Sequence, residues 1–314
     1  MIKNTLPEFE QLIARGASPV TPALSNFLQQ AGLTCSEQEG NFLWQREADL
    51  LDEQAVLDQI QAMLPPGYDR QVLLEIHRTV GSTNDEVMTR LSEPGQNLIV
   101  CTAEMQTAGK GRRGRTWVSP FGRNIYLTLG YFHEGEASEL GGLSLIAGMK
   151  LVEVLRGVGI AGAGLKWPND VLLDGGKMAG ILVELKPREK RGVGVVLGMG
   201  VNLQLSMEDG RQIDQPWSAA GGDLQLSRSE LTGRLAAEVV GALEAFTEQG
   251  FAPFARAWPT FNLYAGREVR IIRGGVESEG IDRGVDENGN LLLETAHGVE
   301  RHNAGEVSLR PVAS

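Results

Sequence analysis

The feature that most constrains the fold is that apolar, strand-like segments follow one another without a helix between each pair. Residues 97–105 and 124–132 are two such segments, and residues 165–185 read as two strands joined by the turn sequence Asp-Gly-Gly. Helical patterns cover residues 137–159 and 227–250. Because strands and helices do not strictly alternate, we predict an α+β protein with a mixed or antiparallel sheet.

The chain divides into three regions. Residues 1–66 hold short helical patterns around a strand-like stretch, and they close at the breaker sequence "LPPG". Residues 67–261 mix strands and helices. Residues 262–314 are short alternating strands separated by turn sequences, which is the pattern of a small β-barrel. We therefore expect three domains: 1–66, 67–261 and 262–314.

The composition indicates a cytoplasmic protein. The 314 residues carry a net charge of −11, which argues against general affinity for nucleic acids or membrane surfaces. The two cysteines match no metal-binding or disulfide pattern, as expected in a reducing compartment. We see neither a signal-peptide pattern nor the ~20 consecutive apolar residues that a membrane span requires.

One segment, "AEMQTAGKGRRGRTWVSPFG" at 103–122, runs against this acidic balance. Glycines alternate there with four cations: Lys110, Arg112, Arg113 and Arg115. Glycines let a backbone approach a ligand closely, and the cations suit phosphate oxygens. The alternatives are a solvated loop or a non-specific nucleic-acid patch. The spacing "GKGRRG" also matches a dinucleotide-binding pattern, but no helix with an acidic partner follows it.

Three further motifs carry polar residues beside apolar strands. In "GSTNDE", at 81–86, Thr83 and Glu86 fit a helix capping box, while the hydroxyls of Ser82 and Thr83 could also meet a polar ligand. In "LKWPNDVLLDGGKMAGILVEL", Lys166, Asn169 and Asp170 surround Pro168, either as a plain turn or as a site. The third motif is "GMGVNL", in which Asn202 ends a strand.

No convincing catalytic nucleophile is present. The four histidines are scattered, and neither cysteine lies in an electropositive segment. An enzyme built on this chain would work by positioning its reactants and stabilising charge, which is how phosphate-centred chemistry is usually catalysed.

Taken in order, these motifs resemble those of biotin–protein ligases, and the resemblance extends over residues 71–311. It implies a class II synthetase-like catalytic domain of mixed sheet and helices, followed by a small SH3-like β-barrel. The lipoate ligases share this architecture but differ at the lysine motif. The family uses MgATP to convert biotin to biotinyl-5′-AMP and then transfers biotin to a lysine of a carboxylase carrier domain. A homodimer through the central sheet is a further expectation, with the strand at 192–200 as a candidate edge.

The resemblance also assigns roles to individual residues. Lys177, Arg112 and Asp170 are the expected catalytic residues, and Asp170 is also the candidate for organising Mg²⁺. The nucleotide is expected to contact Arg115, Trp117, Asn169 and Asn202. Biotin is expected to contact Ser82, Thr83, Asn84, Gln106, Lys110, Gly111, Arg112 and Lys177. The family usually has arginine where this chain has Lys110, and a lysine lacks the two-pronged donor geometry of arginine.

Bifunctional members of the family carry an N-terminal winged helix that represses biotin synthesis genes. Here "GLTCSEQEGNFLWQ" resembles the wing hairpin, and "SPVTPALSNFLQQAG" sits where a recognition helix would be. Residues 16–66 hold one basic residue, Arg46, against seven acidic ones. Since duplex DNA is bound through cations that meet phosphates, we predict a degenerate winged-helix region that does not bind DNA.

Overall fold

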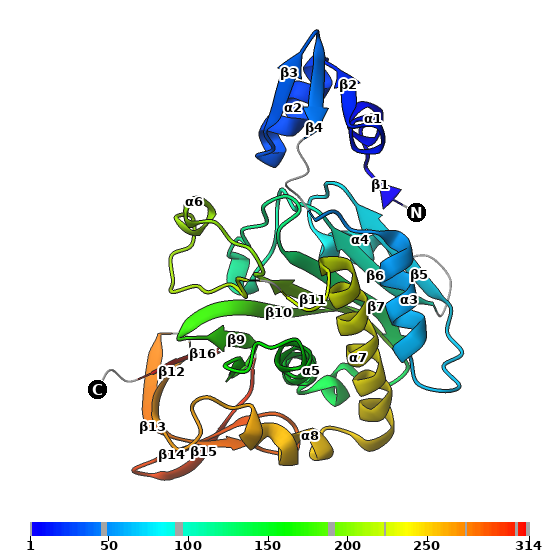
Figure 1. The fold of residues 1–314 in the computed structure, drawn as a ribbon. Helices are drawn as coiled ribbons and strands as arrows, with labels where there is room; N and C mark the ends of the chain where they lie inside the picture. Colours follow the sequence, from blue (N-terminus) through cyan, green and yellow to red (C-terminus); the bar gives the residue numbers. More distant parts are fainter. Residues whose placement is uncertain are drawn as a thin grey trace.

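The computed structural model describes residues 2–44, 49–91, 97–187, 192–222, 224–273, 275–304 and 307–311, without the side chains at 307, 308 and 311. Its strands form three sheets (Figure 1). The largest is a central sheet of eight strands, and a three-stranded and a five-stranded sheet lie toward the N- and C-terminal ends of the chain. The described residues contain no helix long and apolar enough to cross a membrane.

The N-terminal region is a small unit of two helices and three strands. In chain order it holds α1 (Pro7–Arg15), β2 (Ala17–Pro19), α2 (Pro22–Ala31), β3 (Cys35–Gln38) and β4 (Asn41–Trp44). The hydroxyl of Thr21 caps α2 by accepting a hydrogen bond from the Leu24 amide at 3.1 Å. The predicted helix and wing hairpin are therefore α2 and β3–β4. The strands pair antiparallel in the order β2-β4-β3.

The central sheet is mixed, as predicted. In spatial order its strands are β1 (Ile2–Lys3), β5 (Val72–His77), β6 (Leu98–Ala103), β7 (Ile125–His133), β11 (Val193–Val201), β10 (Gly176–Pro187), β9 (Asp170–Leu173) and β8 (Gly164–Lys166). The first three run parallel, and every later pair is antiparallel. The strand expected at a sheet edge, β11, instead lies between β7 and β10. That expectation was wrong, because the edges of the described sheet are β1 and β8.

Residues 165–185 form three strands rather than the predicted two. The segment that we took as one strand breaks into β8 and β9 at Trp167–Pro168, whose peptide bond is cis. The predicted turn is present between β9 and β10. Asp174 and Gly175 both have positive φ, at 51° and 79°, which is the geometry of a tight hairpin turn.

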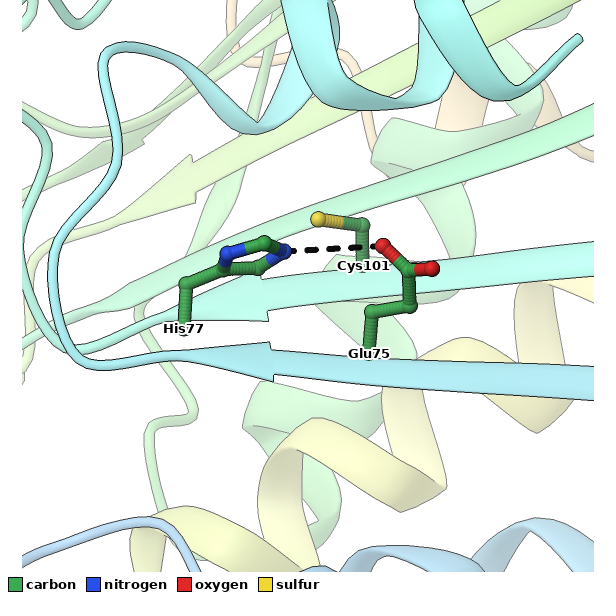
Figure 2. Close-up of side chains that lie close together, drawn as sticks. All are labelled: Glu75, His77 and Cys101. Atoms are coloured by element: carbon green, nitrogen blue, oxygen red, sulfur yellow. Dashed lines mark ion pairs between the residues drawn. The ribbon is translucent and has the colours of Figure 1, made fainter. Parts of the chain in front are cut away.

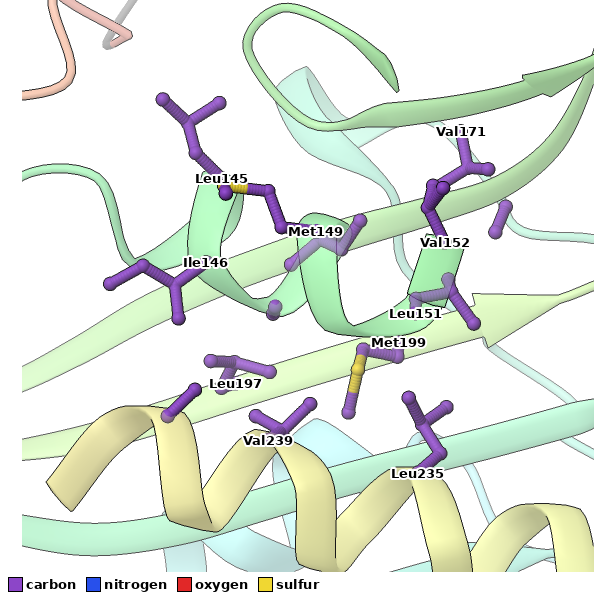
Figure 3. Close-up of a cluster of buried hydrophobic side chains, with 14 of the residues drawn as sticks. Leu145, Ile146, Met149, Leu151, Val152, Val171, Leu197, Met199, Leu235 and Val239 are labelled. Carbon is purple, nitrogen blue, oxygen red and sulfur yellow. The ribbon is translucent and has the colours of Figure 1, made fainter. Parts of the chain in front are cut away.

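Helices cover both faces of the central sheet. On one face lies α4 (Thr83–Arg90), which packs with Ile99 and Val196. The other face carries α3 (Glu53–Met63), α5 (Leu143–Gly157) and α7 (Arg228–Gln249). Figure 3 shows this second layer, where side chains of β11 such as Leu197 lie between α5 and α7. Helix α3 falls within the region expected to end at residue 66, yet its Val56 and Ile60 belong to this core.

The C-terminal region is a five-stranded antiparallel sheet, which confirms the predicted run of short strands. It follows the short helices α6 (Met207–Gly210) and α8 (Ala252–Ala257) along the chain. In spatial order its strands are β15 (Gly298–His302), β14 (Leu291–Thr295), β13 (Val276–Val285), β12 (Glu268–Arg273) and β16 (Val307–Pro311). Leu291, Leu293 and Leu309 are its buried leucines, and they join the core of the central region.

Candidate active site

A cavity of about 380 Å³ gathers all the predicted site residues. They come from the N-terminal end of α4, the segment 103–122, strands β9 and β10, and the residues just before β9 and just after β11. The predicted residues that line it are Ser82, Thr83, Asn84, Gln106, Lys110, Gly111, Arg112, Arg115, Trp117, Asn169, Asp170, Lys177 and Asn202. Residues that lie up to 120 positions apart in the sequence thus form one site.

The basic segment is a folded loop. Lys110 pairs with Thr116 as a short antiparallel bridge, and the Trp117 amide donates to the Gly109 carbonyl at 2.8 Å. A Cβ on Gly109 would lie 2.5 Å from the carbonyl oxygen of Trp117, so this close return requires glycine. At its tip, Arg113 and Gly114 have φ of 59° and 71° and turn the chain.

The N-terminal end of α4 meets this loop through Gln106. The Thr83 amide and hydroxyl both donate to the Gln106 side-chain oxygen, at 3.0 and 3.1 Å. In turn, the Gln106 side-chain nitrogen donates to Ser119 at 3.1 Å. The predicted capping box is wrong, because the residue at the cap position is Ser82 and the Thr83 hydroxyl is bound to Gln106 instead.

Behind this end of the helix, Thr128 of β7 fixes two of the predicted biotin contacts. Its hydroxyl lies 2.8 Å from both the Thr83 hydroxyl and the Asn84 side-chain oxygen. The Asn84 side-chain nitrogen donates to Glu184 at 2.7 Å. Side chains held in this way are preorganised for hydrogen bonds to a polar ligand.

Cations converge on Asp170 at the other end of the cavity. The Lys177 nitrogen lies 2.7 Å from one carboxylate oxygen of Asp170, and the Lys166 nitrogen lies 3.8 Å from the other. Arg112 donates to the side-chain oxygen of Asn169 at 2.9 Å and to the Ala304 carbonyl of the C-terminal region at 2.7 Å.

Burial makes this end of the cavity receptive to anions. It lowers the pKa of Lys166, which the charge of Asp170 offsets only in part. Burial, together with the charge of Arg113, also lowers the pKa of Arg112. Both cations are poorly hydrated and lie near other positive charges, so a bound anion would stabilise their charged forms.

Trp117 lies over a groove of glycines between β10 and β11. A Cβ on Gly200 would lie 2.4 Å from the Trp117 ring, and a Cβ on Gly180 would lie 3.2 Å from it. The Lys177 nitrogen lies 5.4 Å from the centre of the same ring, within range of a cation–π contact. The glycines therefore make room for the indole inside the cavity.

Several residues that line the cavity were given no role from the sequence. Lys166 was noticed beside Pro168 but received no role, although it is 9% exposed and faces Asp170. Trp217 and Arg310 also line the cavity. Trp217 packs beside Lys177 through a bridge between the two backbones. We recognised no sequence pattern that marks Trp217 or Arg310, because both belong to segments that are far from the site motifs in the sequence.

Comparisons with known proteins identify the family of this chain. Residues 77–202 match the Biotin/lipoate A/B protein ligase family, and residues 264–310 match the Biotin protein ligase C terminal domain. The chain is 38% identical to the bifunctional ligase/repressor BirA of Escherichia coli over 233 residues, which cover 74% of this chain and 72% of that one. It is 34% identical to the biotin–[acetyl-CoA-carboxylase] ligase of Mycobacterium tuberculosis, with 82% and 95% covered.

A solved structure shows the same likeness. The biotin protein ligase from Aquifex aeolicus, in complex with biotin and ATP, aligns with a TM-score of 0.61 and 27% identity, over 78% of this chain and all of that one. The chain belongs to the biotin protein ligases of the biotin/lipoate A/B protein ligase family.

Proposed function

We propose that this protein activates biotin with ATP to form biotinyl-5′-AMP, and then transfers biotin to a lysine of a carboxylase carrier domain. The observation that carries this proposal is the convergence of Arg112, Lys166 and Lys177 in one cavity of a protein whose net charge is −11. Biotin carboxylate and ATP are both anions, and at about 4 Å two like unit charges repel by about 4 kcal/mol near a protein surface. The cations would cancel that repulsion and stabilise the charge that develops at the α-phosphate.

Lys177 has the central role in this proposal. Its nitrogen faces Asp170 at 2.7 Å. Arriving phosphate and carboxylate oxygens would compete with Asp170 for the lysine. The same exchange would free an oxygen of Asp170 for the Mg²⁺ that accompanies ATP. A single carboxylate together with substrate phosphates is a usual way for proteins to hold Mg²⁺, so the residues present fit the ion.

The two ends of the cavity would take the two substrates. Thr83, Asn84 and Gln106 offer both donors and acceptors, which suits the ureido ring of biotin. Trp117 offers an aromatic face for adenine, with Asn202 of the neighbouring loop on the nucleotide side. Lys110, Gly111, Arg112 and Arg115 would lie along the carboxylate and phosphates.

The test is incubation of the protein with MgATP, biotin and a purified carrier domain, scored by the mass of the carrier. We expect the mass of one biotin to be added, only when ATP is present. The Lys177→Ala variant should lose biotinyl-AMP formation while its circular dichroism stays unchanged. A Lys177→Ala enzyme that forms the adenylate at nearly the wild-type rate would exclude the role given to this lysine.

We infer that the N-terminal region does not act as an operator-binding domain. Its helix α2 contains no lysine or arginine, and its hairpin strand β3 carries Glu37. Phosphate contacts need cations, so this surface should be repelled by duplex DNA. Operator binding that weakens with salt, in a gel shift with biotinyl-AMP present, would contradict the inference.

A homodimer remains a prediction, but β11, the strand proposed as its interface, does not lie at a sheet edge. Because β11 is flanked on both sides, a partner would have to use another surface. Sedimentation of the protein with and without biotin and ATP would decide the oligomeric state.

A further inference from the structure

Glu75, His77 and Cys101 place three kinds of metal ligand together on one face of the central sheet (Figure 2). Glu75 and His77 lie two residues apart on β5, so they point to the same face, and Cys101 is the partner of Glu75 on β6. One carboxylate oxygen, one imidazole nitrogen and the thiol sulfur all lie within 4.8 Å of one another. The cluster lies beneath α4 and does not line the candidate active site.

The cluster is buried and incompletely hydrogen-bonded. Glu75, His77 and Cys101 are 9%, 2% and 0% exposed. Oε2 of Glu75 and Nε2 of His77 lie 3.5 Å apart as an ion pair, and neither atom has a second hydrogen-bond partner among the described residues. A buried pair held by one long contact beside a thiol has free coordination capacity on its carboxylate and its sulfur, and a metal ion would use both.

The surroundings hold both side chains through the atoms that point away from the cluster. Lys3 and Arg90 pair with Oε1 of Glu75, which leaves Oε2 directed at the cluster. The Asn4 side-chain nitrogen lies 3.0 Å from Nδ1 of His77. Rotating that amide by 180° would present its oxygen to Nδ1, which would then carry the ring proton and leave the lone pair on Nε2 for a metal. Burial lowers the pKa of His77, which favours the neutral ring that coordinates metals.

We propose that Glu75, His77 and Cys101 form a binding site for a zinc-type divalent cation. A thiolate, an imidazole and a carboxylate are the three side-chain ligands that zinc uses, with a water completing a tetrahedron. Ligand atoms of such a site are roughly 3.3–3.8 Å apart, given metal–ligand bonds of about 2.0–2.3 Å. A pair at the outer limit of 4.8 Å would close by about 1 Å on binding, which side-chain rotation can supply.

Binding has a definite proton balance. The thiol of Cys101 loses its proton to solvent as the sulfur–metal bond forms, so one proton is released for each metal bound. Burial raises the pKa of that thiol, which means that the metal must supply the driving force for ionisation.

Neighbouring charges both oppose and assist the ion. Lys3 and Arg90 repel a cation, while Glu86 of α4 is near enough to act on the pKa of both His77 and Cys101 and would attract it. Removing the charge of Lys3 should therefore tighten metal binding. Adventitious binding at surface histidines would not respond in this way.

The test uses the full-length protein, freed of metal with EDTA and titrated with CoCl₂ without ATP. Cobalt reports on zinc sites because thiolate ligation gives a near-ultraviolet charge-transfer band and tetrahedral geometry gives strong visible bands. We expect saturation at one equivalent and displacement by ZnCl₂. The variants Cys101→Val and His77→Leu should each weaken binding at least about tenfold.

Matched controls separate this cluster from other ligands of the same kind. Cys35→Ser and His302→Gln change a cysteine and a histidine outside the cluster, and both should titrate like the wild type. Lys3→Met should bind cobalt about tenfold more tightly. The proposal is overturned by a wild-type titration that lacks the thiolate band, or by Cys101→Val binding as the wild type does. Should Cys101→Val fail to fold, an unchanged affinity in Lys3→Met overturns it.

Discussion

Lys110 stands at a position where the resemblance places arginine, and the structure shows what the lysine contacts. Its amino group pairs with Asp85 in the first turn of α4, and that hydrogen bond raises the pKa of Lys110. Both side chains are well exposed, so the pair holds the loop weakly. Lys110 can therefore leave Asp85 for the carboxylate of biotin, but it offers that carboxylate one contact where arginine would offer two.

We predict that Lys110→Arg slows the release of biotinyl-AMP several-fold. Two parallel hydrogen bonds to one anion are stronger than a single point contact. Rapid-dilution measurements of adenylate release from the two enzymes would check this. Asp85→Asn is the control, because it removes the competing partner without changing the cation. Equal release rates for Lys110→Arg and the wild type would show that this position does not control retention.

Asp282 offers a pH-dependent prediction away from the active site. It is 1% exposed, and burial raises its pKa even though Asn262 and the Gly284 amide donate to it at 3.1 and 2.7 Å. The folded state therefore binds this proton more tightly than the unfolded chain, so Asp282 makes the protein more stable as pH falls toward 3.8. In urea titrations from pH 7 to 4, the wild type should gain stability relative to Asp282→Asn. A difference that stays constant with pH would contradict the burial argument.

At the residue scale, the residues proposed from the sequence lie together because they belong to compact polar motifs beside strands. All thirteen predicted residues line one cavity. No role was assigned to Lys166 from the sequence, because its importance comes from its burial, at 9% exposure, and from its position facing Asp170. Neither property belongs to its local sequence. The predicted capping box was wrong for a similar reason. The Thr83 hydroxyl donates to the side chain of Gln106, which lies 23 residues away in the sequence.

At the scale of the elements, the type of each strand was predictable but its neighbours were not. The apolar run at 192–200 indicated a strand, and the buried residues along both faces of β11 fit a central position rather than an edge. The break between β8 and β9 at Pro168 was also hidden, because an apolar run on both sides of a proline resembles one strand. Pairing depends on long-range contacts that periodicity does not encode.

The glycines of β11 give a prediction about this element. A Cβ at Gly200 would lie 2.4 Å from the Trp117 ring, so Gly200→Ala should displace the indole at a cost of about 1–3 kcal/mol. We expect the KM for ATP to rise about tenfold with little change in biotin binding. Gly241→Ala is the matched control, because a Cβ there makes only ordinary contact with Pro65 at 3.6 Å. An unchanged KM for ATP in Gly200→Ala would show that Trp117 does not contribute to nucleotide binding.

At the scale of the whole molecule, the N-terminal region packs against both ends of the basic loop. Met105 and Phe121 flank the loop, and both lie in the N-terminal core with Phe9. The Phe9 and Phe121 rings meet edge to face, with centroids 5.7 Å apart. Nearby, Arg78 donates to Glu10 of α1 and to the buried carboxylate of Glu104. We infer that this packing holds the ends of the loop in place, in keeping with a degenerate winged-helix region kept for packing.

This packing predicts that a mutation outside the cavity alters ligand retention. Phe9→Leu keeps an apolar side chain of similar size, so the region should stay folded, yet it loses ring contacts worth about 0.5–1.5 kcal/mol each. We expect the adenylate to leave several-fold faster, because the end of the loop at Phe121 is held less firmly. Leu12→Met is the control, since Leu12 is equally buried on the same helix. If Phe9→Leu and Leu12→Met release the adenylate at the wild-type rate, the N-terminal region covers the loop without restraining it.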